Sequence, residues 1–409
     1  MPTSWEKQYA QRTQKMSSSA IREILKVTQF PDVISFAGGL PSPDVFPIAE
    51  FKEAYDVILN EQGPQSLQYS LTEGYPPLRA YLAEETSQRI DIRISADNIL
   101  ITNGSQQVAD LLGKVFIDPG DKILVEEPTY LGALQAWRAY QAEFVTVPTD
   151  EDGMIPAALE EKLKSNPKFI YALPTFQNPT GISYSLERRQ QIVELANQYG
   201  VPIFEDDPYG RLQFEGEELP TLISLDSQYH GEACAESYQG NVIYTSTFSK
   251  ILAPGIRLAW VIAPKEVTAK IVQAKQGVDL HTSTINQMVA HHVIHEGFLN
   301  KQIAMIREVY KKRRDIMMQA MQEYFPASVT WTHPKGGLFI WVTLPEGLNA
   351  AELLKIAVDQ KRVAFVPGAP FYPNGGGERT CRMNFSNATE EGIREGVSRL
   401  GEVISEQLG

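Results

Sequence analysis

Short apolar runs alternate with amphipathic segments through the middle of the chain. Runs rich in β-branched and aromatic residues, typical of buried strands, occur at residues 99–102, 122–125, 169–173, 201–204, 242–245 and 258–262. Between them, apolar residues recur at helical spacing from Val108 to Phe116, and Ser185 is a plausible N-cap for a helix that reaches Tyr199. This alternation predicts an α/β fold with a mostly parallel sheet and helices on both of its faces.

The C-terminal part of the chain has a different pattern. A helix, a strand, a helix and a further strand are predicted in that order near residues 297–325, residues 336–342, residue 350 onwards and residues 382–385. We therefore expect three parts: an N-terminal arm at residues 1–45, a large domain at 46–296 and a smaller α+β domain at 297–409. The arm combines a helical pattern at residues 19–28 with a turn-rich stretch at 36–43, and it is expected to pack on another part of the protein.

Composition narrows the class of protein. The net charge of −13 disfavours nucleic acid as a partner, because non-specific binding needs clustered basic residues, and the one compact basic run, residues 311–314, falls in a helical pattern. Cys234 and Cys381 are too few for a disulfide framework. No stretch approaches the ~20 apolar residues that a membrane span requires, and the first residues do not resemble a signal peptide. The sequence predicts a cytoplasmic protein with no membrane partner.

Lys250 carries the strongest chemical signal. It lies in a Ser/Thr-rich turn behind the apolar run at residues 242–245, and Arg257 follows it. A lysine that forms a Schiff base needs a sheltered site in which its pKa falls, and hydroxyl groups beside an arginine are suited to anchor a phosphate. Pyridoxal 5'-phosphate, an aldehyde with a phosphate group, satisfies both requirements. The alternative is a surface lysine after a strand.

Polar residues follow the other predicted strands as well. Residues 104–107 open a helix whose free N–H groups suit an anion, or they form an ordinary N-cap. Asn178 either donates to a phenolate oxygen or belongs to a simple turn. A carboxylate of residues 205–207 either pairs with a pyridine nitrogen or caps the next helix, and Tyr130 either stacks on a flat cofactor or lies in the core. Parallel strands end at one edge of a sheet, so these residues are expected to converge.

This series of motifs resembles the fold-type-I pyridoxal-phosphate aminotransferases over nearly the whole chain. The motifs lie at residues 103–107, 127–130, 178–181, 206–209 and 246–250, with Arg257 and Arg382. Residues 16–26, 36–43 and 67–70 resemble, more narrowly, the 2-aminoadipate and kynurenine aminotransferase subgroup. The resemblance implies a seven-stranded type of sheet and a homodimer with shared active sites.

The resemblance also implies a role for each matching residue. Lys250 would be the Schiff-base lysine and proton shuttle, and Asp206 would pair with the pyridine nitrogen. Asn178 and Tyr209 would bind the phenolate oxygen, and Tyr130 would stack on the ring. The phosphate would be bound by Ser105, Gln106, Thr247 and Arg257, together with Tyr69 from a second subunit. The substrate would be bound by Arg382, Asn178 and Gly39. Ser249 ranks below Thr247 as a phosphate ligand. Thr247 replaces the serine of many family members and keeps the hydroxyl.

The implied reaction is a ping-pong transfer of an amino group from an L-amino acid to a 2-oxo acid, with 2-oxoglutarate as the expected acceptor. Donor candidates are 2-aminoadipate, aromatic and branched-chain amino acids. Arg22 either meets a second substrate carboxylate or lies on a helix surface. Two alternatives remain open: another reaction on the same fold, such as that of a β-lyase or decarboxylase, and a non-enzymatic regulator that binds pyridoxal phosphate. No metal site is expected.

Overall fold

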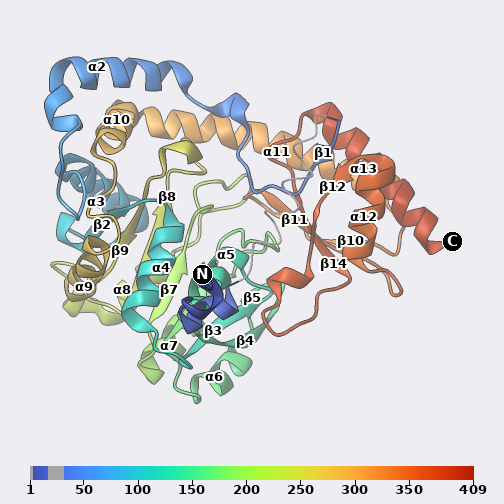
Figure 1. Ribbon diagram of the computed structural model, residues 1–409, viewed down its shortest axis with the longest axis horizontal. Helices are drawn as coiled ribbons and strands as arrows, with labels where there is room; N and C mark the ends of the chain where they lie inside the picture. Colours follow the sequence, from blue (N-terminus) through green and yellow to red (C-terminus); the bar gives the residue numbers. More distant parts are fainter. Residues whose placement is uncertain (1–2, 17–31) are drawn as a thin grey trace.

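The computed structural model describes residues 3–16 and 32–409, and its strands form two main sheets (Figure 1). The large sheet has the order β2-β9-β8-β7-β6-β3-β4-β5. Its strands are β2 (Ile99–Thr102), β3 (Lys122–Glu127), β4 (Glu143–Asp150), β5 (Gly153–Met154), β6 (Phe169–Ala172), β7 (Ile203–Asp206), β8 (Val242–Thr247) and β9 (Ala259–Ile262). The mostly parallel α/β sheet predicted from the sequence is confirmed.

Strand direction determines where the polar strand ends meet. Strands β4, β3, β6, β7 and β8 pair in parallel, whereas β9 is antiparallel to both of its neighbours, β8 and β2. Strand β2 therefore runs in the same direction as β8. Every residue of β2, β6, β7, β8 and β9 is buried, as expected for strands covered on both faces. The segments that follow β2, β3, β6, β7 and β8 leave the sheet at one edge.

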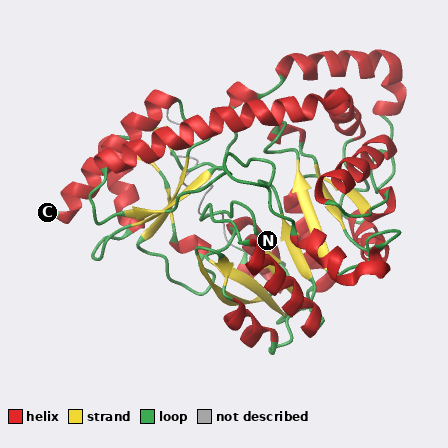
Figure 2. Ribbon diagram, turned by 180° about the vertical axis from the view of Figure 1, so that it is seen from behind, coloured by secondary structure: helices red, strands yellow, loops and turns green. Residues whose placement is uncertain are grey.

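Helices cover both faces of the large sheet, with the strands inside (Figure 2). The helices before the small sheet are α2 (Ile48–Ser66), α3 (Pro76–Ile90), α4 (Ser105–Phe116), α5 (Leu131–Arg138), α6 (Pro156–Leu163), α7 (Leu186–Tyr199), α8 (Leu222–His230), α9 (Lys265–Gln276) and α10 (Thr284–Ile294). Helices α4, α5 and α9 pack on one face around Trp137, whose indole N–H donates to the Ala109 carbonyl at 2.9 Å. Ser185 caps α7, as predicted, because its hydroxyl accepts from the Arg188 N–H.

The small sheet has the order β10-β11-β14-β13 and is antiparallel. Its strands are β10 (Thr330–Trp331), β11 (Phe339–Thr343), β13 (Val366–Pro367) and β14 (Thr380–Asn384), and it packs with α11 (Phe298–Tyr324), α12 (Ala350–Lys361) and α13 (Glu390–Leu408). Helix α11 runs from beside α10 to the small sheet (Figure 1). The short 3-10 helices are η1 (Trp5–Lys7), η2 (Gln11–Lys15), η3 (Pro43–Val45), η4 (Ala96–Asn98), η5 (Gly231–Cys234), η6 (Pro254–Ile256), η7 (His295–Gly297) and η8 (Ala369–Phe371).

The end of the predicted arm lies against the C-terminal part of the chain. Strand β1 (Ile34–Ser35) pairs in parallel with β12 (Val363–Ala364), and the Asn384 N–H donates to the Phe36 carbonyl at 2.8 Å. The helical pattern at residues 19–28 lies outside the described residues. The division at residues 45 and 296 stays a prediction. Among the helices in the described part of the chain, none is both long and apolar enough to span a membrane.

Candidate active site

A cavity of about 280 Å³ lies at the edge of the large sheet where the parallel strands end, and it is closed by β11 and β14 of the small sheet. Eleven residues expected in the site line it: Gly39, Ser105, Gln106, Tyr130, Asn178, Asp206, Tyr209, Thr247, Lys250, Arg257 and Arg382. The other lining residues are Leu40, Leu173, Pro208, Ser249, Pro254 and Phe339. The fold therefore brings together side chains that are more than 300 residues apart in the sequence.

Lys250 extends into this cavity from the turn after β8. Its Nζ donates to the Gly39 carbonyl at 2.7 Å. Burial, followed by the positive charges of Arg382 and Arg257, lowers the pKa of Lys250 to about 8. An amine with this pKa is partly unprotonated near neutral pH, so Lys250 is able to act as a nucleophile and to accept a proton.

Asp206 is the last residue of β7 and presents one unpaired oxygen. Its Oδ2 accepts a hydrogen bond from the Tyr171 hydroxyl at 2.9 Å, whereas the buried Oδ1 has no hydrogen-bond partner among the described residues. Burial raises the pKa of Asp206 to about 7, against the hydrogen bond from Tyr171, and the neighbouring Asp207 carboxylate raises it further. A buried acceptor without a partner is costly. A cationic N–H group at Oδ1 would remove that cost.

The start of α4 forms an anion cradle with β8 and Arg257. Gly104 has φ 80°, and a Cβ at this position would lie 2.3 Å from Arg257 Nη2, so only glycine lets the guanidinium approach this closely. Ser105 and Gln106 supply the first N–H groups of α4, which have no acceptor inside the helix. Nearby, the Thr247 and Ser249 hydroxyls lie 3.0 Å apart. Hydroxyls, helix N–H groups and a guanidinium together suit a phosphate.

Arg382, on β14 of the small sheet, contacts the segment that follows β6 of the large sheet. Its Nη1 donates to Asn178 Oδ1 at 2.7 Å and its Nη2 to the Ala37 carbonyl at 2.9 Å, while the buried Nε has no partner among the described residues. The guanidinium lies over the Phe339 ring, 4.2 Å from its centroid. Burial lowers the pKa of Arg382 to about 10. The group remains a cation at neutral pH and has a donor available for a carboxylate.

Two phenols complete the walls. Burial raises the pKa of Tyr209, and the Tyr209 ring meets Phe339 edge to face at 5.9 Å between centroids. Burial also raises the pKa of Tyr130, whose ring packs where a Cβ of Gly132 would otherwise lie. Both phenols therefore stay neutral near pH 7 and are able to donate a hydrogen bond.

Sequence reasoning missed the residues that support the site. Tyr171 and Phe339 were expected only as parts of strands. In the structure the Tyr171 hydroxyl donates a hydrogen bond to Asp206, and the Phe339 ring packs against the Arg382 guanidinium. A tyrosine inside a wholly apolar strand was the available signal, because a buried hydroxyl needs a partner. Tyr69 does not line the cavity; it is 79% exposed, with its ring 5.8 Å from that of His281. Arg22 lies outside the described residues.

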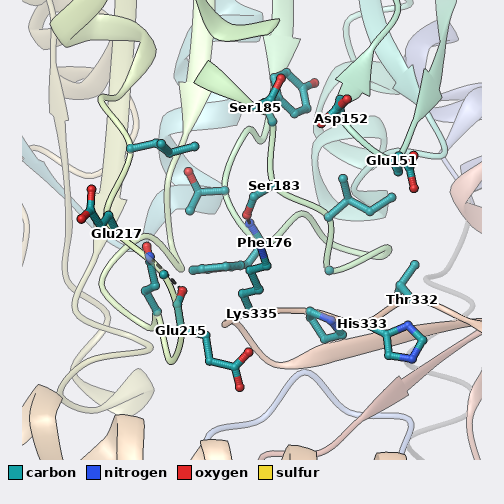
Figure 3. Close-up of a pocket in the computed structure, with 18 of the residues that line it drawn as sticks. Glu151, Asp152, Phe176, Ser183, Ser185, Glu215, Glu217, Thr332, His333 and Lys335 are labelled. Atoms are coloured by element: carbon teal, nitrogen blue, oxygen red, sulfur yellow. Dashed lines mark hydrogen bonds between the residues drawn. The ribbon is translucent and has the colours of Figure 1, made fainter. Parts of the chain in front are cut away.

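The loop that follows β6, which contains Asn178, also borders a second, larger cavity of about 900 Å³ (Figure 3). Its walls come from residues 175–176 and 181–185 of the loop after β6, from residues 213–219 and from residues 331–335. Several of its charged residues, among them Glu151, Asp152, Glu217 and Lys335, are exposed. Among the described residues, the two cavities share no lining residue.

Comparison with known proteins decides the family. The family model "Aminotransferase class I and II" matches residues 31–400. The chain belongs to the class I and II aminotransferases. It is 45% identical to the aromatic-amino-acid aminotransferase 1 of Thermococcus litoralis, over 99% of this chain and 95% of that protein. It is also 45% identical to the 2-aminoadipate transaminase of Thermus thermophilus, over 98% of both chains.

A solved aminotransferase structure has the same fold. The alpha-aminoadipate aminotransferase LysN of Thermus thermophilus, complexed with N-(5'-phosphopyridoxyl)-L-leucine, superposes with a TM-score of 0.91 at 43% identity and covers 99% of both chains. The fold is thus that of the fold-type-I enzymes, and the protein is a pyridoxal-phosphate-dependent aminotransferase. The cavity fits this cofactor: the unpaired Asp206 Oδ1 suits a pyridinium N–H, and the cradle at Gly104 suits a phosphate.

Proposed function

We propose that this aminotransferase moves the amino group of an L-amino acid to 2-oxoglutarate by a ping-pong mechanism centred on Lys250. One observation carries the proposal. A single cavity holds an amine of lowered pKa, a buried carboxylate oxygen without a partner, an anion cradle and a buried guanidinium with an unpaired donor. Each group answers one requirement of transamination.

Besides Lys250 and a Tyr69 from the second subunit, eight residues would hold the cofactor. Asp206 would accept the pyridinium N–H at Oδ1, while Asn178 and Tyr209 would donate to the phenolate oxygen and Tyr130 would stack on the ring. The phosphate would bind at the cradle, where its contacts are the N–H groups of α4, the hydroxyls beside β8 and a guanidinium, contributed by Ser105, Gln106, Thr247 and Arg257. Ser249 lies within reach of Thr247 and is a further ligand at this position.

Bound pyridoxal phosphate supplies an aldehyde that holds amino groups covalently and a ring that withdraws electrons from the substrate α-carbon. Lys250 Nζ, unprotonated above about pH 8, would accept the proton of that carbon and would later act as the acid that returns a proton. Asp206 would keep a proton on the ring nitrogen. The raised pKa of Asp206, caused chiefly by burial, falls when a cation lies beside it, so the carboxylate ionises where the cation needs it.

Arg382 would bind the substrate α-carboxylate. Its two Nη atoms already donate to Asn178 and to the Ala37 carbonyl, which fix the plane of the guanidinium. The unpaired Nε then lies at one edge, where a carboxylate oxygen completes its hydrogen bonds. Gly39, whose carbonyl meets Lys250 and whose Cα faces the Phe339 ring, would border the same substrate.

The donor class follows from the relatives rather than from the cavity. The relatives' names include 2-aminoadipate and aromatic amino acids, which supports these as donors beside branched-chain amino acids. Arg22 is the candidate for a second carboxylate. Arg22→Ala should weaken the binding of 2-aminoadipate and glutamate by ~1.5–3 kcal/mol and leave the binding of leucine unchanged. Equal losses for acidic and apolar donors in half-reactions without 2-oxoglutarate would show that Arg22 only supports the arm.

A homodimer with shared active sites is the second part of the proposal. Tyr69 is exposed, and so are its apolar neighbours Leu67 and Leu71 and, from a neighbouring loop, Leu280. An exposed apolar cluster of this kind is typical of a protein interface. We propose that it meets a second copy, so that Tyr69 of each subunit reaches the phosphate of the other. Light scattering should give a dimer, and Tyr69→Phe should release the cofactor more readily; an active monomer would refute the assignment.

The decisive test is the fate of the amino group. A panel of amino donors is incubated with 2-oxoglutarate, and glutamate is measured alongside the keto acid formed from each donor. Transamination gives the two products in equal amounts. Carbon dioxide release, or pyruvate formed without glutamate, would instead support a decarboxylase or a β-lyase on the same fold. The cytoplasmic location expected from the sequence stays a prediction, and fractionation would test it.

A further inference from the structure

Asp279, in the loop after α9, holds the segment that begins α4. Its Oδ2 accepts hydrogen bonds from Asn103 Nδ2 at 2.5 Å and from Gln107 Nε2 at 2.6 Å. Gln107 Oε1 in turn accepts from the Asn103 backbone N–H at 2.8 Å. The two ends of the five-residue segment are thereby tied to each other and to one carboxylate.

The segment between these ties is the anion cradle. It contains Gly104, Ser105 and Gln106, and the Asn103 carbonyl accepts from Arg257 Nη2 at 3.4 Å. The direction of the first N–H groups of α4 and the place of the Arg257 guanidinium both depend on where Asn103 lies. Phosphate affinity depends on such alignment, because each N–H must point at an oxygen.

Lys275 keeps the Asp279 carboxylate ionised. The Lys275 side chain is completely buried, and its Nζ donates to Asp279 Oδ1 at 2.6 Å. Burial alone would raise the pKa of Asp279, but hydrogen bonds from Lys275, Gln107 and Asn103 outweigh it and lower the pKa. The carboxylate thus serves three donors with two oxygens.

We propose that Asp279 is a positioning residue for the cofactor phosphate, acting through Asn103 and Gln107 on the N–H groups that open α4. The proposal rests on the phosphate site proposed above. Asp279 itself does not line the cavity, so it is not a direct ligand of a group bound there.

The charge of Asp279 and its hydrogen bonds predict opposite effects. A negative charge near a phosphate repels it, so a purely electrostatic role predicts that Asp279→Asn binds the cofactor more tightly. Positioning predicts weaker binding. An asparagine has one acceptor oxygen, so its NH₂ group must face either the buried Lys275 ammonium or the two amide donors from Asn103 and Gln107.

The test compares two aldehydes that differ only by the phosphate. Full-length protein is freed of cofactor, and calorimetry gives Kd for pyridoxal 5'-phosphate and for pyridoxal. The ratio of Kd for pyridoxal to Kd for pyridoxal 5'-phosphate measures how much the phosphate contributes to binding. Asp279→Asn should reduce this ratio roughly ten- to hundredfold, with little change for pyridoxal. Asn103→Ala, which removes one tie and keeps the Lys275–Asp279 pair, should reduce it in the same direction.

Asp315→Asn is the matched control. Asp315 pairs with Lys311 across one helical turn of α11, at 2.9 Å, so its replacement removes the same charge away from the cradle and should leave the ratio unchanged. Tighter phosphate binding in Asp279→Asn, or equal weakening of both aldehydes, would overturn the proposal.

Arg257→Ala separates this inference from the site on which it rests. If Arg257→Ala reduces the ratio and the two positioning variants do not, Asp279 has no positioning role. If Arg257→Ala leaves the ratio unchanged, the phosphate lies elsewhere and the proposed site fails. Melting curves of each cofactor-free variant check folding; should Asp279→Asn not fold, Asn103→Ala decides the question alone.

Discussion

The two cavities adjoin the same loop after β6 but differ in whether their buried polar groups have hydrogen-bond partners. The larger, of about 900 Å³, is bordered by exposed charged residues, and its one buried cation, Arg189, donates to the carbonyls of Tyr184, Pro220 and Pro174. The smaller, of about 280 Å³, contains buried Asp206 and Arg382, each with an atom that has no partner among the described residues.

Between these two cavities, unsatisfied buried groups therefore distinguish the candidate active site better than volume does. In the described part of the larger cavity, Trp331 Nε1 is also unpaired, but an indole is neutral and only a donor. In the smaller cavity the unpaired atoms belong to ionisable groups, and the same cavity is lined by an amine whose pKa burial lowers to about 8. Such groups are expected where a ligand supplies the missing hydrogen-bond partner, because burial without a partner is destabilising.

Lys250→Ala gives the largest effect expected from this comparison. Removing the amine removes both the nucleophile and the proton carrier, so turnover should fall by roughly three orders of magnitude or more. Steady-state kinetics with a good donor measures the change. Lys335→Ala in the larger cavity is the control and should retain full activity; a Lys250→Ala enzyme with near-normal turnover would show that the smaller cavity is not the site.

Asp206→Ala should lower turnover by roughly two orders of magnitude, because a ring nitrogen without its carboxylate withdraws electrons poorly. Tyr171→Phe removes only the hydrogen bond to Asp206 Oδ2 and should cost much less. Comparing kcat of the two variants tests whether the charge or its orientation matters. Similar losses in both would mean that Asp206 acts through the Tyr171 contact rather than through its unpaired oxygen.

Arg382→Ala should lower kcat/KM for every donor, because every amino acid has an α-carboxylate. The loss is expected at ~1.5–3 kcal/mol for each charged hydrogen bond removed. Arg382→Lys should recover only part, since lysine lacks the planar pair of donors. A loss confined to one donor class would instead assign Arg382 to the side chain of the substrate.

The pH at which Lys250 captures an aldehyde tests the smaller cavity without turnover. Because burial and two arginines favour the neutral amine, the rate at which cofactor-free protein captures pyridoxal should rise about tenfold per pH unit up to about pH 8 and then level off. Arg382→Ala removes one positive charge, so its midpoint should move to higher pH. An unchanged midpoint would leave burial and the positive charge of Arg257 as the causes of the lowered pKa.

The sequence predicted the polar residues at the strand ends better than the residues that hold them in place. Strand β7 was expected at residues 201–204 and lies at Ile203–Asp206, because Glu205 and Asp206 are buried within it, where acidic residues are not expected. Strand β4 was missed, since Pro148 and charged ends interrupt its pattern. Motifs located eleven cavity residues, but Tyr171, Phe339 and Asp279 act through tertiary contacts that no local pattern encodes.

The smallest expected effect concerns the larger cavity. Trp331→Phe replaces the indole by a smaller phenyl ring, so it removes the unpaired indole N–H together with part of the packing against Phe325. Activity should stay within about twofold of the wild type, whereas stability reflects two opposed changes: the lost packing destabilises the protein, and the loss of a buried donor without a partner stabilises it. Kinetics and thermal melting measure both quantities. A marked fall in kcat would mean that this cavity communicates with the active site through the loop after β6, whose Asn178 contacts Arg382, and that its unpaired donor has a function after all.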